Sequence, residues 1–130
     1  INILVAEDNQ INQMVLKGIL SKLGMSCAFA NNGQEAYETY IHHSEDYQLL
    51  LMDWEMPVMD GPVATQMIRD WEKVSKATAI PIIALTAHAL EQYEVEAIAH
   101  GMQGLLTKPI DTSLLESTIN KFARPGKVAR

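Results

Sequence analysis

The chain has 130 residues, of which 48% are hydrophobic and 20% are charged, a composition that is ordinary for one globular domain with a substantial core. Its 16 acidic and 10 basic residues give a net charge of −6, which argues against nucleic acid as a direct partner. The lone Cys27 excludes an internal disulfide, and no apolar run is long enough to cross a bilayer. We therefore expect a domain without secretory signal or direct membrane contact, suited to a reducing compartment.

Short apolar runs alternate along the chain with longer segments whose apolar residues recur at helical spacing. In chain order, these patterns predict a strand at Ile3–Ala6, a helix from Asn9 to Leu23, a strand at Ser26–Ala30, a helix at Glu35–His43, a strand at Leu49–Met52, a helix at Val63–Val74, a strand at Ile80–Leu85, a helix at Leu90–His100, a strand at Leu105–Thr107 and a helix from Asp111 to Phe122. Asn9 and Asp111 are suited to cap the helices that they begin.

Two of these helices carry a large apolar set that we expect to face the core. Its members are Ile11, Met14, Val15, Ile19, Leu20 and Leu23 in the first helix, and Leu114, Leu115, Thr118, Ile119 and Phe122 in the last. A helix between consecutive strands forces those strands to lie parallel through right-handed crossovers. Five strand–helix units, too few for the common closed barrel, predict an α/β fold with an open, doubly wound parallel sheet.

Charged and hydroxyl side chains stand where four of the predicted strands end. Glu7 and Asp8 follow the first strand, Asp53 the third, Thr86 the fourth and Lys108 the fifth. The carboxyl ends of parallel strands lie along one edge of the sheet, where such folds bind ligands. Carboxylates gathered there repel one another unless a cation is present, and their oxygens are preferred ligands of Mg²⁺. The sequence therefore predicts a site that handles a phosphoryl group with the help of Mg²⁺.

Asp53 is the best candidate for the reacting group. It stands alone at the end of an entirely apolar strand, whereas Glu7 and Asp8 form a pair suited to hold metal. Aspartate carboxylates serve as covalent phosphoryl acceptors in other proteins. The metal and Lys108 would stabilise charge on the transferring group, and the Thr86 hydroxyl is available at the same edge.

Four segments, in this order and spacing, carry a resemblance that spans nearly the whole chain. They are residues 3–9 (ILVAEDN), 51–61 (LMDWEMPVMDG), 81–87 (PIIALTA) and 106–111 (LTKPID). With these segments the chain resembles the receiver domains of two-component signalling, in which an aspartate accepts a phosphoryl group from a phosphohistidine. The resemblance implies a flavodoxin-like (βα)5 fold with the strand order 2-1-3-4-5.

By this resemblance, Asp53 is the phosphoacceptor. Glu7 and Asp8 match the acidic pair that holds Mg²⁺, with Mn²⁺ as an alternative ion and Asp8 as a direct ligand. Asp53 and the backbone carbonyl of Glu55 complete the protein ligands. Glu55 and His88 also occupy the two places that tune how fast the phosphoryl group is lost, and we expect them to do so here.

Lys108 matches the lysine that contacts the phosphoryl group, and Thr86 matches the switch hydroxyl that moves to meet it. The peptide bond before Pro109 is expected to be cis, an isomer that is accessible mainly before proline. One position departs from the family pattern, because receivers often carry an aromatic residue three positions before the lysine and this chain has Leu105. A leucine cannot turn inward as a ring does, so the aromatic half of the switch is in doubt.

The segment from residue 7 to residue 12 further resembles receivers fused to hybrid sensor histidine kinases, which pass the phosphoryl group to a histidine phosphotransfer domain. We therefore expect a histidine kinase domain as phosphodonor and a histidine phosphotransfer protein or domain as acceptor. Residues 1–123 are predicted to form the receiver domain and residues 124–130 a tail or linker, in a chain cut from something longer. The expected location is the cytoplasm, which is compatible with a parent protein anchored in the inner membrane.

Other interpretations fit part of the same pattern. The domain can belong to a response regulator with its own effector output. A small hydrolase with an aspartyl-phosphate intermediate would use Glu55, two residues after Asp53, as general acid, but no stretch is long enough for the cap insertion that binds substrate in such enzymes. A nucleotide binder lacks support, because no phosphate-cradling glycine loop follows the first strand. Whether self-phosphorylation and slow autodephosphorylation make the chain an enzyme is left open.

Overall fold

The computed structural model describes residues 1–88 and 90–125, and this part of the chain contains five strands that alternate with five helices. In chain order they are β1 (Asn2–Ala6), α1 (Gln10–Lys22), β2 (Ser26–Ala30), α2 (Gly33–His42), β3 (Leu49–Asp53), α3 (Gly61–Ser75), β4 (Ile82–Thr86), α4 (Glu91–Ala99), β5 (Gly104–Thr107) and α5 (Thr112–Phe122). Every element predicted from the sequence is present, with ends that differ by at most two residues.

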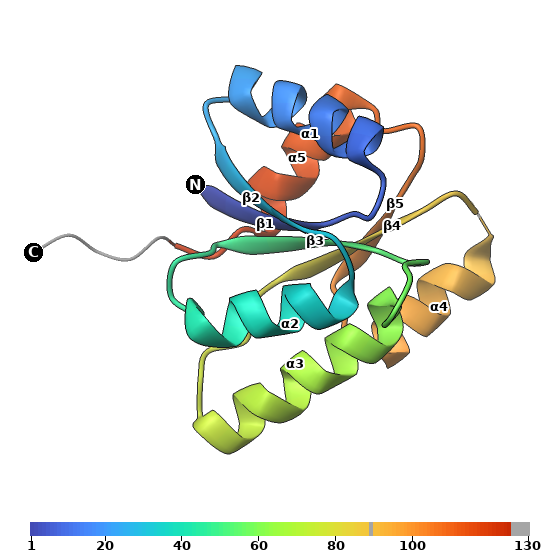
Figure 1. The fold of residues 1–130 in the computed structure, drawn as a ribbon. Helices are drawn as coiled ribbons and strands as arrows, with labels where there is room; N and C mark the ends of the chain where they lie inside the picture. The colour runs from blue at the N-terminus through green and yellow to red at the C-terminus, as the bar shows by residue number, and fades with distance from the viewer. Residues whose placement is uncertain (89, 126–130) are drawn as a thin grey trace, which may run out of the picture.

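All strand pairs are parallel, and the strands lie in the order β2-β1-β3-β4-β5, which confirms the flavodoxin-like, doubly wound α/β fold. Helices α1 and α5 cover one face of the sheet, and α2, α3 and α4 cover the other (Figure 1). β3 lies in the middle of the sheet, and all of its residues are buried, as its apolar sequence predicts.

The two faces of the sheet build separate apolar cores from alternate residues of the same strands. In β1, Leu4 packs with residues of α2 and α3, whereas Ile3 and Val5 pack with residues of α1 and α5. All three side chains are fully buried, and burial of each stabilises the fold by about 1.5–3 kcal/mol relative to exposure. A shift of one residue along β1 would exchange the two sets, so this alternation fixes the register that places the strand ends.

Four helices begin with a side chain that accepts a hydrogen bond from a free backbone N–H. Asn9 and Asp111 cap α1 and α5 as predicted, and Asn32 and Asp60 cap α2 and α3 in the same way. α4 differs, because Leu90 stands at its cap position and makes no side-chain hydrogen bond there. Such a cap is typically worth about 1 kcal/mol, so α4 depends more on its tertiary contacts than the other helices do.

The prediction that the apolar set of α1 faces the core is wrong for three of its residues. Ile11, Met14 and Val15 are 71%, 73% and 53% exposed, whereas Leu16 and Leu20 are buried. Successive residues of a helix are about 100° apart, so the three exposed residues lie on the side of α1 away from the buried pair. The helix thus has an inner and an outer apolar face, and helical spacing alone does not show which one meets the sheet.

A similar correction applies to α5. Leu114, predicted to face the core, is 52% exposed, and Thr118 is half-buried with its hydroxyl donating to the Leu114 carbonyl at 2.7 Å. Leu115 and Ile119 are fully buried, so these two residues hold α5 against the sheet.

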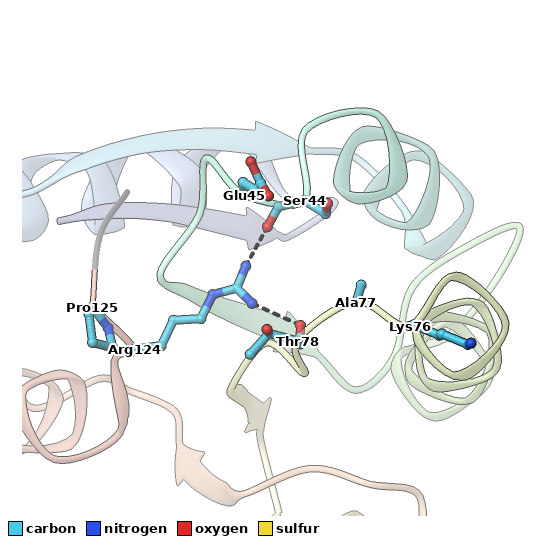
Figure 2. A pocket seen from close by; sticks show the side chains of 7 residues that line it. All are labelled: Ser44, Glu45, Lys76, Ala77, Thr78, Arg124 and Pro125. Atoms are coloured by element: carbon cyan, nitrogen blue, oxygen red, sulfur yellow. Dashed lines mark hydrogen bonds between the residues drawn. The ribbon is translucent and has the colours of Figure 1, made fainter. Parts of the chain in front are cut away.

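The end of α5 is tied to the two loops that precede β3 and β4 (Figure 2). The Arg124 guanidinium donates hydrogen bonds to the backbone carbonyls of Ser44, Tyr47 (3.0 Å) and Thr78 (2.9 Å). Its backbone N–H donates to the Gln48 carbonyl at 3.0 Å. A cavity of about 420 Å³ lies beside this arginine, at the edge of the sheet opposite the carboxyl ends of the strands.

The predicted domain boundary at residue 123 stays a prediction. Arg124 packs against the domain, and residues 126–130 of the predicted tail lie outside the described part of the chain. Within residues 1–88 and 90–125, no helix has the length and apolar character that a membrane span requires.

Candidate functional site

The residues predicted to form the site line one cavity of about 290 Å³ at the carboxyl edge of the sheet. They comprise Glu7 and Asp8 after β1, Asp53 and Glu55 at the end of β3, Thr86 and His88 at the end of β4, and Lys108 after β5. Glu7 and Lys108 are 101 residues apart in the sequence, yet their side chains are in direct contact. The parallel sheet therefore gathers the charged groups as the strand-end argument predicts.

Lys108 lies between two of the carboxylates. Its Nζ atom is 2.8 Å from Oε1 of Glu7 and 3.2 Å from Oδ1 of Asp53. Burial acts to lower the pKa of Lys108, but the two carboxylates outweigh burial and raise it. The amine is therefore charged, and it offsets part of the negative charge of the cavity.

Glu7 is the most buried acid of the site, with an exposed fraction of 1%. Its Oε2 accepts a hydrogen bond from the Asn9 backbone N–H (3.1 Å), and its Oε1 accepts from the Asn12 side-chain amide (3.4 Å). Burial acts to raise the pKa of Glu7, but the hydrogen bonds from Lys108 and Asn9 outweigh it, so the pKa lies below its ordinary value. Glu7 is thus an ionised group in a fixed position, and Asn12 is a neighbour that the sequence argument missed.

Asp53 shows the opposite shift. It is 6% exposed, and burial together with the charge of Glu7 raises its pKa to about 7, against the attraction of the Lys108 ammonium. Trp54, itself 9% exposed, follows Asp53 and lines the same cavity. The ionised Asp53 carboxylate is therefore held at an energetic cost, which a further cation beside it would reduce.

The donor set fits a divalent cation. One carboxylate oxygen from each of Glu7, Asp8 and Asp53 lies within 4.8 Å of the other two. The Lys108 ammonium pairs with Glu7 and Asp53, and Asp8 is exposed at the mouth of the cavity. Hard carboxylate oxygens with access for water are the ligands that Mg²⁺ prefers. The backbone carbonyl of Glu55 as a further ligand stays a prediction.

Thr86 and the two residues predicted to tune the site form a chain of contacts at the rim of the cavity. The hydroxyl oxygen of Thr86 accepts a hydrogen bond from the His88 backbone N–H at 3.1 Å. Nε2 of His88 lies 3.6 Å from Oε1 of Glu55. Thr86 is 2% exposed, whereas the side chains of His88 and Glu55 are 49% and 76% exposed. The pair therefore stands on the solvent side of the buried Thr86 and Asp53.

Leu105 is half-buried and packs against the core cluster that contains Trp54. Tyr93 of α4 packs against the same cluster and stacks on the His88 ring. Tyr93 could not be predicted as part of the site, because helical spacing gives no sign that it turns toward the rim. The Lys108–Pro109 peptide bond is cis, which is the isomer that the resemblance implies.

The chain belongs to the response regulator receiver domain family, whose sequence profile matches residues 3–120. It is 39% identical over 122 residues to hybrid signal transduction histidine kinase I of Dictyostelium discoideum, covering 91% of this chain and 7% of that protein. It is 35% identical over 157 residues to histidine kinase 1 of Arabidopsis thaliana, covering 97% of this chain and 13% of that protein. The chain thus spans a small part of the length of the curated relatives it matches.

Solved structures give the same family. One is the co-crystal structure of the Saccharomyces cerevisiae histidine phosphotransfer signaling protein Ypd1 with the receiver domain of its downstream response regulator Ssk1, with a TM-score of 0.85, 35% identity, and coverage of 95% of this chain and 88% of that chain. Another is the receiver domain of sensor histidine kinase PA1611 from Pseudomonas aeruginosa PAO1, with a magnesium ion coordinated in its active site cleft. Its TM-score is 0.81 at 34% identity, with 93% of this chain and 95% of that chain covered.

Proposed function

We propose that Asp53 accepts a phosphoryl group from a phosphohistidine donor and passes it to a histidine phosphotransfer partner. The strongest support is that Asp53 is a buried carboxylate with a raised pKa, in contact with Lys108 and beside two further acids. The P–N bond of the donor breaks as an Asp53 oxygen forms a P–O bond, and the released imidazole takes a proton from solvent. Nucleophilic catalysis by a carboxylate of this kind forms an acyl phosphate.

The neighbouring side chains have separate roles in this proposal. Glu7 and Asp8, with Asp53, would hold Mg²⁺ or Mn²⁺, both of which carboxylate oxygens suit. When bound, the ion supplies positive charge that stabilises the transferring phosphoryl group. Lys108 contacts Asp53 already, so its ammonium is placed to pair with phosphoryl oxygens. Thr86 supplies a hydroxyl that can donate to the same group.

Glu55 and His88 are proposed to control how fast the phosphoryl group is lost. They contact each other at the solvent side of the cavity, where water must pass to reach Asp53. The bulk of the two side chains and the Glu55 carboxylate therefore affect the approach of the water that hydrolyses the acyl phosphate.

The outer apolar face of α1, formed by Ile11, Met14 and Val15, supports docking of a phosphotransfer partner. A partner histidine that reaches Asp53 must come from a protein that covers the surface around the cavity, and α1 begins two residues after Asp8. Exposed apolar side chains grouped beside a polar site are typical of protein–protein interfaces. A receiver similar to this chain has been crystallised with such a phosphotransfer protein.

This docking is tested by transfer from the phosphorylated chain to Ypd1. We expect Val15→Lys to slow the loss of the phosphoryl group to Ypd1 about tenfold or more, because a buried lysine costs more than 1.4 kcal/mol at an apolar interface. Val74→Lys is the matched control, since Val74 is 85% exposed at the far end of α3. Equal transfer rates in both variants would contradict docking on α1.

The kinase context is part of the proposal. Relatives that match this chain are named hybrid or sensor histidine kinases, which supports a kinase domain as phosphodonor. The unpaired Cys27 is compatible with a reducing cytoplasm. The similarity to the receiver domain of a response regulator supports a second candidate, a parent protein with its own effector domain. A kinase core or an effector domain encoded beside this segment in its gene decides between the two.

The phosphoacceptor is tested by intact-mass measurement after incubation with acetyl phosphate and Mg²⁺. The wild type and Asp70→Asn, an exposed aspartate on α3, should each gain one phosphoryl group, and Asp53→Asn should gain none. A gain that persists in Asp53→Asn contradicts the proposal. Many turnovers of phosphate esters per chain would instead support the hydrolase.

A further inference from the structure

Three aromatic rings from three separate segments stack at the rim of the site. The Tyr93 ring of α4 lies nearly parallel to the His88 imidazole, with centroids 5.1 Å apart and planes at 16°. It meets Trp54 edge-on, with centroids 5.4 Å apart and planes at 72°. Trp54 follows Asp53, and His88 lies two residues after Thr86. Tyr93 therefore connects α4 to the neighbours of both the proposed phosphoacceptor and the proposed switch hydroxyl.

Apart from this stack, the first half of α4 has few contacts that hold it. Leu90 provides no side-chain cap, Val95 is 62% exposed, and Ala97 alone is buried among residues 91–99. The other end of α4 is anchored, because Arg69 donates to the Gly101 carbonyl from Nε at 2.9 Å and from Nη2 at 2.8 Å. The start of α4 can therefore move about a fixed end.

The Thr86 hydroxyl connects this stack to Asp53. In the unphosphorylated protein it accepts a hydrogen bond from the His88 N–H. A phosphoryl group on Asp53 would offer charged acceptor oxygens, which form stronger hydrogen bonds than neutral groups do. When the Thr86 side chain rotates so that its hydroxyl donates to that group, the Thr86 oxygen moves away from the His88 N–H. The His88 ring then loses the support that keeps it on Tyr93.

We propose that Tyr93 is the aromatic residue that reads phosphorylation in this chain: the movement of Thr86 displaces His88 from Tyr93, and the start of α4 is released. Leu105, which lacks a ring, then needs no part in the switch. The proposal deepens the proposed function and rests on phosphorylation of Asp53. It predicts that Trp54 becomes more exposed to water on phosphorylation, because Tyr93 covers it in the resting protein.

Trp54 fluorescence tests this directly in a Trp71→Phe parent, since the chain has two tryptophans. Each sample is compared with Mg²⁺ alone and with Mg²⁺ plus acetyl phosphate, and intact mass reports phosphorylation in the same sample. The parent should show an emission maximum that moves to longer wavelength on phosphorylation. Tyr93→Phe keeps the stack and should behave like the parent, as should Tyr37→Leu, a matched change on α2. Tyr93→Leu should gain the phosphoryl group with an emission maximum that is already shifted and moves no further.

A shift of the parent's size in Tyr93→Leu overturns the proposal, as does an unshifted parent that has gained the phosphoryl group; both leave the proposed function intact. A parent that gains no mass overturns the proposed function and the switch together. Amide hydrogen exchange in the parent gives a second measurement that does not require a substitution of Tyr93. Phosphorylation should lower the protection of amides in residues 91–99 and leave those of α1 unchanged, and unaltered protection of α4 contradicts the switch.

Discussion

Two buried carboxylates stand at opposite edges of the sheet and differ in how they are partnered. Glu72 of α3 is 4% exposed; its Oε1 accepts from Arg69 at 2.8 Å, and its Oε2 accepts from the Tyr40 hydroxyl at 2.7 Å and the Ile80 N–H at 2.8 Å. Asp53 is 6% exposed, shares Lys108 with Glu7, and is repelled by the charge of Glu7. A carboxylate with donors on both oxygens holds structure together, whereas one short of donors is available for chemistry.

The donors around Glu72 also join distant elements. Tyr40 comes from α2, Ile80 precedes β4, and Arg69 reaches on to Gly101 after α4. Burial and the Glu72 carboxylate raise the pKa of Tyr40, which keeps its hydroxyl protonated as a donor. The contrast between Glu72 and Asp53 therefore predicts opposite consequences when each carboxylate is removed.

The largest change in stability is expected when the fully hydrogen-bonded Glu72 carboxylate is removed. Glu72→Ala should destabilise the protein by about 3–5 kcal/mol, because it removes the charge partner of Arg69 and leaves the Tyr40 hydroxyl and the buried Ile80 N–H without their acceptor. Urea unfolding measures the loss. Glu38→Ala, an exposed change on α2, should stay within about 0.5 kcal/mol of the wild type. Similar stabilities of the two variants would remove the contrast between the edges.

Asp53→Asn should raise the free energy of unfolding of the metal-free protein, whereas Glu72→Ala lowers it. The pKa of Asp53 is about 7 when folded and 3.8 ordinarily, so the folded state binds more protons between these values and loses stability as pH rises through that window. The penalty is complete above pH 7, where Asp53→Asn should be more stable than the wild type by on the order of 1–3 kcal/mol. Unfolding of both proteins in a chelator at pH 8 and pH 5 measures this. The difference should shrink at pH 5, and a less stable variant at pH 8 contradicts the account.

A smaller effect, on the lifetime of phosphorylated Asp53, is expected when Glu55 or His88 is changed. Glu55→Ala and His88→Ala should each change the half-life of phosphorylated Asp53, and the double variant should change it by less than the two effects combined, because the side chains contact each other. The decay of the phosphorylated mass in Mg²⁺ gives the half-lives. His42→Ala, an exposed change on α2, should leave the half-life unaltered. Unchanged half-lives in both single variants would end the proposal that these residues tune the site.

The residues of the Asp53 site could be predicted from the sequence, whereas the hydrogen-bond partners of Glu72 could not, and the reason is physical. Asp53 ends β3 and Lys108 directly follows β5, and a parallel sheet brings such positions together whatever the helices do. Glu72 sits in a helix among other charged residues, where the sequence gives no sign of its partners. The orientation of a helix decides whether a residue such as Tyr93 or Met14 meets the site or solvent, and helical spacing leaves that rotation open.

The carboxylates clustered at the Asp53 edge outnumber the Lys108 ammonium, so a divalent cation bound there should stabilise the fold. Thermal unfolding in increasing MgCl₂, at constant ionic strength set with KCl, measures this stabilisation. We expect the melting temperature to rise with Mg²⁺ in the wild type and in Asp70→Asn. The rise should be lost in Asp8→Asn, because the Asp8 side chain offers one of the clustered ligand oxygens. A wild-type melting temperature indifferent to Mg²⁺, or an equal rise in Asp8→Asn, would contradict it.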